Sequence, residues 1–136
     1  TNMRKKRHNI IKKWRAKKTE KSRLEAGYEK LNEVDGEAGK NIVDNLGDLG
    51  KYIVEFAFGD IYSRDGLGLR EREIATIAML TVLSKPEQLK VHIQGGLNVG
   101  LTYEEIEEII IHTAPYSGFP TAINAMNVLK GFSEHK

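Results

Sequence analysis

Apolar residues recur at three- and four-residue spacing along most of the chain, as they do on one face of an amphipathic helix. A short helix is predicted for 24–34 and, after the turn-forming pair Asp35-Gly36, a longer one for about 37–62. No stretch shows the period-two alternation, bounded by hairpin turns, that is typical of strands. The pattern therefore predicts an all-α fold. The apolar stripe of the longer helix comprises Ile42, Val43, Leu46, Leu49, Ile53, Val54 and Phe56.

Four further helices are predicted after the turn sequence SRDGLGLR at 63–70. Only Ser84 and Lys85 separate the first two, so these two helices are expected to form a tight antiparallel hairpin. The predicted ranges are 70–83, 86–100, 103–112 and, beyond the loop PYSGFP at 115–120, a last helix that ends near Phe132.

Two of these helices begin with the pattern of a capping box, in which a Ser or Thr is followed three residues later by Glu. Ser84 with Glu87 fits this pattern, and so does Thr102 with Glu105. We therefore expect Ser84 and Thr102 to cap the helices that follow them.

The helix predicted for 86–100 contains His92 and the glycine pair Gly95-Gly96. Each glycine costs about 1 kcal/mol relative to alanine inside a helix, so stability alone does not explain them. Gly96 lies four residues after His92 and shares its face, where we expect it to leave space above the imidazole. Gly95 is expected to let another helix approach.

The chain has 136 residues, of which 40% are hydrophobic, enough to bury the core of one globular domain. The longest apolar run, at 74–83, is about half as long as a bilayer-spanning helix, and the N-terminus is too charged for a signal peptide. We therefore expect a cytoplasmic protein without membrane insertion. The chain has no cysteine, which excludes disulfides, thiolate nucleophiles, Cys-ligated zinc and iron–sulfur clusters.

Positive charge is concentrated at the N-terminus. Residues 1–18 contain nine Lys/Arg and no acidic residue, whereas the remainder contains twelve Lys/Arg and nineteen Asp/Glu, giving +9 and −7. We therefore divide the chain into a basic arm or extra helix at 1–19 and a domain at 20–136. The arm could form an amphipathic helix that meets nucleic acid, an acidic membrane surface or an acidic partner, or it could be a solvated arm laid on the acidic body. Its apolar residues at helical spacing are Ile10, Ile11 and Trp14.

Three sequence blocks, GDIYSRDGLGLREREIATIAML, LKVHIQGGLNVGLTYEEIEEII and PYSGFPTAINA, resemble the carboxymuconolactone decarboxylase family over roughly 24–134. The resemblance implies an alkyl hydroperoxidase D-like helical domain of about six helices around a central antiparallel hairpin. It also implies a homo-oligomer, a closed ring such as a homohexamer or a trimer. The implied reaction is cofactor-free decarboxylation of 4-carboxymuconolactone to 3-oxoadipate enol-lactone and CO2, in the catabolism of aromatic compounds.

The thiol branch of this superfamily carries Glu, eleven residues, Cys-x-x-Cys, three residues and His. Glu73 and His92 match the two ends of that motif, whereas Lys85 and Gln88 occupy the two cysteine positions. A dithiol peroxidase works by thiolate attack and disulfide exchange, which no other side chain replaces. Thiol peroxidase activity is therefore disfavoured, and the decarboxylase branch remains.

The implied reaction needs an acid of near-neutral pKa, donors for a developing negative oxygen and a dry pocket, because the lactone itself accepts the electrons left by CO2. His92 is the candidate acid, with Glu73 orienting it and raising its pKa. A simple hairpin places the two residues about 7 Å apart along the axis, so a bridging water or a staggered hairpin is expected. The alternatives are a packed structural His92 and a surface salt bridge between Glu73 and an arginine.

Candidate substrate-binding residues are cations and hydrogen-bond donors near these blocks. A planar guanidinium grips a carboxylate with two parallel hydrogen bonds, although each arginine could equally be a surface residue or a subunit contact. The tyrosine just before the last helix could donate to the lactone oxygen, or could simply pack, and the amides of that helix could hold an anion. The candidates are Arg64, Arg72, Arg70, Tyr116, Lys85 and Gln88, while Trp14, Tyr52, Phe56, Phe58 and Tyr62 are interpreted as core or interface residues.

The sequence contains no pattern that is typical of a metal or cofactor site. The spacing from Glu108 to His112 is one residue too long for the Glu-x-x-His of carboxylate-bridged iron bundles, and no zinc motif is present, so we predict no metal and no cofactor. Two alternative functions stay open. The protein could act on a different small carboxylate or lactone with the same His92 site, or it could be a non-catalytic oligomer whose basic arms bind nucleic acid or another acidic partner.

Overall fold

The computed structural model describes the backbone of residues 1–136 and the side chains of 1–13 and 21–136. The packing predicted for Trp14 therefore lies outside the described residues. Along this described backbone there is no strand, which confirms the all-α prediction. The elements in order are α1 Asn2–Glu20, α2 Arg23–Asp44, α3 Asp48–Tyr52, the π-helix η1 Ile53–Tyr62, α4 Leu69–Val82, α5 Pro86–Asn98, α6 Tyr103–Ser117, α7 Phe119–Lys130 and the 3₁₀ turn η2 Ser133–His135.

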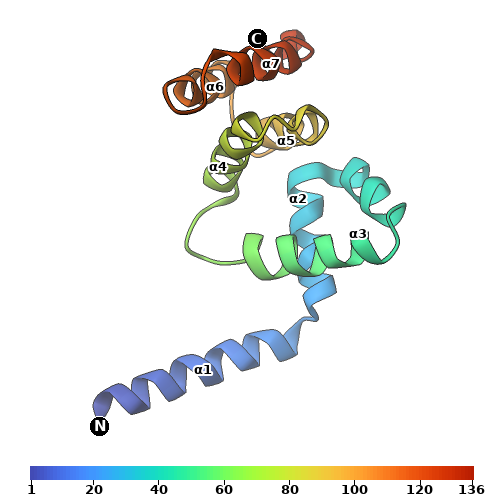
Figure 1. The fold of residues 1–136 in the computed structure, drawn as a ribbon. Coiled ribbons are helices and arrows are strands. Elements are labelled where there is room, and N and C mark those ends of the chain that lie inside the picture. The colour runs from blue at the N-terminus through green and yellow to red at the C-terminus, as the bar shows by residue number, and fades with distance from the viewer.

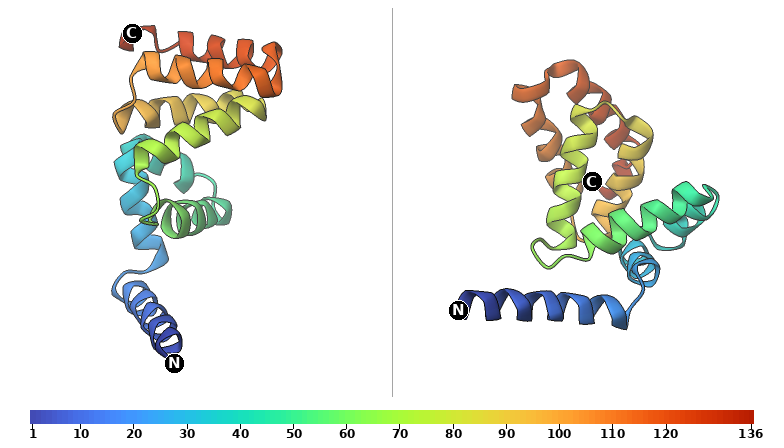
Figure 2. Two further views of the ribbon diagram at one scale, coloured as in Figure 1. Left: turned by 90° about the vertical axis from the view of Figure 1, so that its left-hand side faces the viewer. Right: turned by 60° about the horizontal axis from the view of Figure 1, so that its bottom comes forward.

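The helices of the body stack in three layers (Figures 1 and 2). The α6–α7 pair lies on the α4–α5 pair, which in turn lies on α2, α3 and η1, while α1 extends away from the other helices. No helix is both long enough and apolar enough, over the described residues, to cross a bilayer. One core fills the space between α4, α5, α6 and α7, and the second lies between α2 and η1. The first core is centred on Ile77, Leu89, Ile93, Ile106, Ile110 and Leu129, and the second on Leu31, Val34, Val43, Val54 and Phe58.

The predicted hairpin of α4 and α5 is present, but the cap predicted for Ser84 is wrong. Ser84 has a φ of 55° and is the left-handed residue of a Schellman motif that ends α4. Its amide donates to the carbonyl of Thr81, and the next amide donates to the carbonyl of Leu80. The residue that precedes α5 is Lys85, and Pro86 supplies a preset φ at the first helical position. The box predicted at Thr102 and Glu105 is confirmed, with both capping hydrogen bonds at 3.1 Å.

The predicted single helix over 37–62 is also wrong. The predicted break at Asp35-Gly36 is confirmed, because Gly36 has a non-helical backbone that separates the two halves of α2. The second half ends at Asp44, however, after which Gly47 turns the chain with a φ of 58°. A short helix then leads into the π-helix, whose wider turns change the periodicity of the buried positions. The predicted stripe is therefore split, with only Val43 and Val54 buried. Ile42, Leu46, Leu49 and Phe56 are exposed.

The predicted loop at 115–120 is mostly helical. The sixth helix continues through Pro115 to Ser117, and Gly118, at a φ of 89°, makes the only break before α7. The tyrosine predicted to precede a helix start, Tyr116, therefore lies in the last turn of α6 instead.

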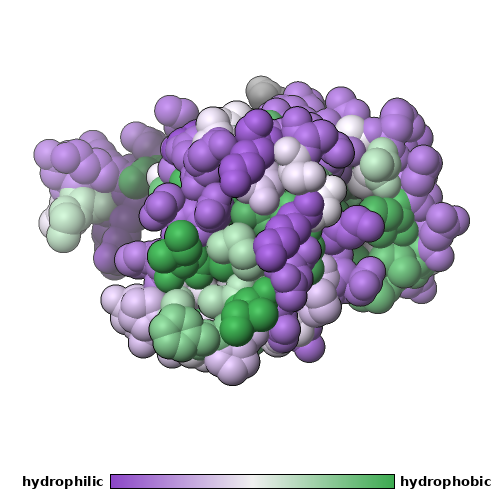
Figure 3. Space-filling model, turned by 90° about the horizontal axis from the view of Figure 1, so that it is seen from above, coloured by the Kyte–Doolittle hydropathy of each residue, from purple (hydrophilic) through white to green (hydrophobic). Residues whose placement is uncertain are grey.

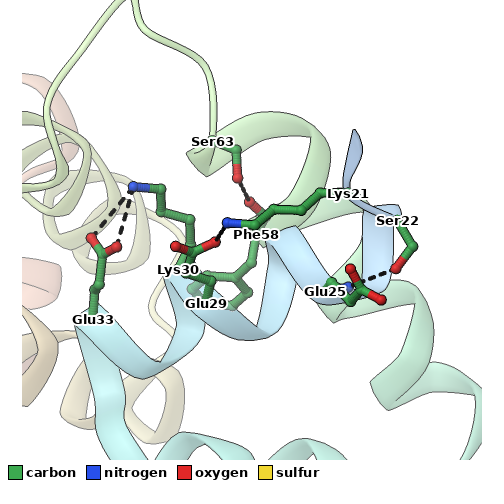
Figure 4. A network of polar contacts seen from close by, with 8 residues as sticks. All are labelled: Lys21, Ser22, Glu25, Glu29, Lys30, Glu33, Phe58 and Ser63. Atoms are coloured by element: carbon green, nitrogen blue, oxygen red, sulfur yellow. Dashed lines mark hydrogen bonds and ion pairs between the residues drawn. The ribbon is translucent and has the colours of Figure 1, made fainter. Parts of the chain in front are cut away.

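The start of α2 is fixed by polar contacts (Figure 4). The Ser22 hydroxyl accepts a 3.1 Å hydrogen bond from the amide of Glu25. Lys21, just before the helix, forms an ion pair with Glu29 further along α2. At the end of η1 the Ser63 hydroxyl donates to the carbonyl of Phe58 over 2.8 Å. These contacts cap both elements of the layer that supports the candidate site.

Candidate functional site

Four elements bring polar side chains together where the two cores meet. His92 comes from α5 and lies next to Ile93 of the first core, and Glu73 comes from α4. Tyr62 is the last residue of η1 and packs against the second core. Asp35 precedes the kink of α2.

The centre of this cluster is a direct contact between His92 and Glu73. Nδ1 of the imidazole lies 3.0 Å from Oε2 of the carboxylate, Glu73 is completely buried, and the His92 side chain keeps 21% exposure. The expected 7 Å offset is wrong because the hairpin turns at Ser84, which leaves a stagger of about three residues, or roughly 4.5 Å, that a Glu side chain spans. Burial of Glu73 also excludes the alternative of a surface salt bridge.

The second oxygen of Glu73 is held by a tyrosine. The Tyr62 hydroxyl donates to Oε1 of Glu73 over 2.8 Å. The Thr76 hydroxyl lies 2.9 Å from both the Tyr62 hydroxyl and the carbonyl of Arg72, and donates to one of them. Burial, and then the charge of Glu73, raise the pKa of Tyr62 well above its ordinary value. Tyr62 is therefore a neutral donor that fixes the orientation of Glu73.

The pKa of His92 is raised above its ordinary value of 6.5. Burial by itself lowers this pKa, but the hydrogen bond to Glu73 and the charges of Glu73 and Asp35 outweigh burial. The bond at Nδ1 leaves Nε2 as the nitrogen that can serve a ligand. No hydrogen bond to Nε2 is present among the side chains that the structure describes. The imidazole is therefore partly exposed, favours its protonated form and can donate a proton, while Glu73 holds its orientation.

Asp35 is the second carboxylate of the cluster. Burial raises its pKa to about 6, the positive charge of His92 opposes this rise, and the charge of Glu73 adds to it. The sequence showed Asp35 only as part of a turn and Tyr62 only as a core or interface residue, so both were missed. The signal that could have found Asp35 was a pair of glycines placed inside helices, Gly39 and Gly95.

The two glycines after His92 have different roles. A Cβ on Gly95 would lie 2.8 Å from Cγ1 of Val34, so the prediction that this glycine admits another helix is confirmed for α2. A Cβ on Gly96 would lie 3.0 Å from Leu101 and 3.1 Å from Ile77. Gly96 therefore makes room for the core of α4–α7 and not, as expected, for space above the imidazole.

The three candidate arginines are in different situations. Arg70 pairs with Glu105 of the capping box that begins α6, and Arg64 is exposed in the turn before α4. Arg72 donates from Nη2 to the carbonyl of Arg64 over 3.2 Å, and its Nε is buried without a hydrogen-bond partner among the described residues. Arg72 is thus the candidate arginine that keeps a buried donor unsatisfied among the described residues.

The remaining candidates lie elsewhere. Lys85 and Gln88 are exposed at the hairpin end of α5, and Tyr116 is 81% exposed with its ring 5.9 Å from that of His112. No hydrogen bond, ion pair or ring contact among the described residues joins these three side chains to the His92–Glu73 pair. No group of three or more His, Asp or Glu side chains, over the same residues, is arranged to hold a metal ion.

The sequence profile of the carboxymuconolactone decarboxylase family matches residues 47–131, which include Tyr62, Glu73 and His92. The chain belongs to this family. It is 34% identical over 114 residues to 4-carboxymuconolactone decarboxylase of Acinetobacter baylyi, covering 80% of this chain and 85% of that protein.

Two further relatives match over shorter stretches. The chain is 36% identical over 76 residues to nitrosuccinic acid decarboxylase of Metarhizium robertsii, covering 56% of this chain and 53% of that protein. An uncharacterized 15.0 kDa protein of Paracoccus denitrificans is 32% identical over 79 residues, with 56% of this chain and 58% of that protein covered. Two of the three relatives are thus named as decarboxylases.

Proposed function

We propose that the protein is a cofactor-free decarboxylase of a small unsaturated acid, with 4-carboxymuconolactone as the favoured substrate and His92 as the proton donor. The observation that carries this proposal is the buried Glu73–His92 pair, which lies inside the segment matched by the family. The length of the match to 4-carboxymuconolactone decarboxylase favours that substrate.

The reaction begins with cleavage of the bond between the ring carbon and its carboxylate. The electron pair left by CO2 enters the conjugated lactone and gives a dienolate. The Nε2–H of a cationic His92 then protonates a ring carbon, which forms the enol-lactone and leaves a neutral imidazole that takes a proton from solvent. Glu73 keeps the imidazole in the tautomer and orientation that this transfer requires, and Tyr62 holds Glu73.

Substrate binding is assigned to Arg72. Its Nε is buried and has no hydrogen-bond partner among the described residues, so it has an unused donor for a carboxylate that stays on the substrate. The cluster lies where the two apolar cores meet, and low polarity around the substrate favours loss of a charged carboxylate as neutral CO2. Arg70 is less suited because it already pairs with Glu105.

A second candidate substrate is a different small dicarboxylic acid. The relationship to nitrosuccinic acid decarboxylase supports it, because a nitro group accepts an electron pair as a conjugated lactone does. The same residues would then act on a substrate that lacks the lactone ring.

The test is turnover of freshly prepared 4-carboxymuconolactone, followed by ultraviolet absorbance and product identification, with nitrosuccinate assayed in parallel. We expect turnover by the wild type and a loss of about 10²-fold or more in His92→Ala. His112→Ala, an exposed histidine on α6, is the matched control and should keep full activity. Turnover of nitrosuccinate alone would change the substrate, and no turnover of either acid by folded protein would overturn the proposal.

A further inference from the structure

We propose that Asp35 is an additional positioning residue of the site, whose carboxylate lies beside the Glu73–His92 pair, where the missing Cβ of Gly95 admits it, and acts on the imidazole through its charge. Asp35 lies outside the segment matched by the family, in a part of the chain to which neither the family match nor the relatives assign a role. The consequence for catalysis rests on the proposed function, whereas the electrostatic coupling does not.

Two glycines make the space that Asp35 occupies. A Cβ on Gly39, one turn later in α2, would lie 2.5 Å from Cβ of Asp35. A Cβ on Gly95, on the facing helix α5, would lie 2.9 Å from Oδ1 of Asp35 and 3.6 Å from Oε2 of Glu73. Any larger residue at either position would push the carboxylate aside. The missing Cβ of Gly95 therefore lets the two carboxylates approach one point on the His92 helix.

The backbone around Asp35 is fixed from two sides. Gly36, with φ 58° and ψ −148°, holds a conformation that is essentially restricted to glycine, and it ends the first half of α2 directly after Asp35. The Asn98 side chain, at the end of α5, donates from Nδ2 to the carbonyl of Val34 over 2.8 Å. The kink and this hydrogen bond hold the end of the half-helix against α5, where the histidine is.

Among the described residues, two carboxylates act on the charge of the His92 imidazole. Glu73 from α4 and Asp35 from α2 are the charged groups that raise the pKa of His92, and Tyr62 from η1 faces Glu73 as a neutral donor. The effect is reciprocal, because the charge of His92 lowers the pKa of Asp35. Glu73 is completely buried and hydrogen-bonded, whereas Asp35 is partly exposed and accepts no hydrogen bond among the described side chains. Asp35 therefore acts on His92 through its charge and not through a hydrogen bond.

The proposal predicts how each cycle is completed. After His92 has given its proton to the substrate carbon, two neighbouring carboxylates favour its reprotonation over a wider pH range than Glu73 alone would. Removal of the Asp35 charge should therefore lower the pKa of His92 and leave the Glu73 contact in place. The alkaline limb of the rate profile should move to lower pH by the same amount.

The experiment is a proton–nitrogen NMR titration of the four histidines in the full chain, with His92 assigned by the signal lost in His92→Ala. In Asp35→Asn the pKa of His92 should fall by about one unit. In Glu33→Gln, which removes an exposed carboxylate two residues away on α2, it should not move. This readout needs no substrate, so it separates failure of the coupling from failure of the proposed reaction.

Substitution of Gly95 or Gly96 gives a second test in which Asp35 is unchanged. Gly95→Ala should displace the carboxylate and lower the pKa of His92, whereas Gly96→Ala presses on Leu101 and Ile77 and should leave it unchanged. An unchanged His92 titration in folded Asp35→Asn, or equal shifts in the two alanine variants, would overturn the proposal. If turnover is present, the pH profile of kcat/KM should follow the NMR shift in each variant.

Discussion

At the scale of single residues, burial of Asp35 lowers the stability of the folded protein once its carboxyl group is ionised. Its pKa rises from 3.8 to about 6 on folding, chiefly because of burial. The folded chain therefore binds the proton of Asp35 more tightly than the unfolded chain does. The favourable contribution of Asp35 to the free energy of unfolding is fully present below about pH 4 and is lost as the pH rises through about 6. Above that pH the ionised carboxylate opposes folding.

Asp35→Asn should therefore be more stable than the wild type at pH 8 and no more stable at pH 4. A shift of this size corresponds to about 3 kcal/mol, but partial exposure of the side chain screens its charge, so we expect a gain of about 1 kcal/mol at pH 8. Urea unfolding at both pH values measures the difference, with Glu33→Gln as the control that should change stability little at either. A loss of stability at pH 8 would show that the carboxylate is structural and would contradict this prediction.

The two members of the cluster that the sequence predicted, His92 and Glu73, were found through a motif, whereas Asp35 was signalled only indirectly, by glycines inside helices, and Tyr62 by no pattern of its own. Asp35 beside a glycine is the common pattern of a turn, and Tyr62 at the end of an apolar segment is the common pattern of a core residue. Their roles depend on which helix lies opposite each of them. That information resides in tertiary packing and not in the spacing of residues along the chain.

At the scale of elements, the kink of α2 is the feature that directs Asp35 toward α5. Gly36 has a backbone conformation that a residue with a Cβ adopts only with strain. Gly36→Ala should cost about 1–3 kcal/mol of stability and should also lower the pKa of His92, because the half-helix carrying Asp35 would shift. Urea unfolding and the histidine titration measure the two effects.

The control for this variant is Gly66→Ala in the turn before α4. Gly66 has open space around it and no positive φ, so alanine should be tolerated there with little change in stability. If Gly36→Ala lowered stability without moving the His92 titration, the kink would be a feature of the fold alone.

The helices themselves were largely predictable, whereas the joints between them were not. The hairpin of α4 and α5 and the capping box at Thr102 follow from sequence pattern. Ser84 was assigned to the wrong helix because the same residue can cap the following helix or close the preceding one, and the left-handed conformation decides for the latter. The π-helix escaped prediction because its wider turns place buried residues at a spacing that differs from 3.6.

At the scale of the whole molecule, the single chain leaves large apolar side chains exposed on several elements, among them α3, η1 and α7. Leu49, Tyr52 and Phe56 lie along α3 and η1, and Phe119 and Ile123 lie on α7. The face seen in Figure 3, from the side of α6 and α7, shows apolar side chains gathered at two places among polar ones. Large apolar side chains gathered on a surface mark contacts with other proteins more often than free surface.

We therefore expect the chain to self-associate through these faces, in line with the ring expected from the family resemblance. Sedimentation velocity should give a mass that is a multiple of 15.3 kDa. Tyr52→Glu or Phe119→Glu should shift the protein toward monomer without loss of helical circular dichroism, because each places a charge in a buried contact. Leu67→Glu, in the turn before α4, is the control and should leave the mass unchanged. A wild type that sediments as a monomer at micromolar concentration would contradict the prediction, and the unpaired Nε of Arg72 would then need its partner from substrate rather than from a neighbouring subunit.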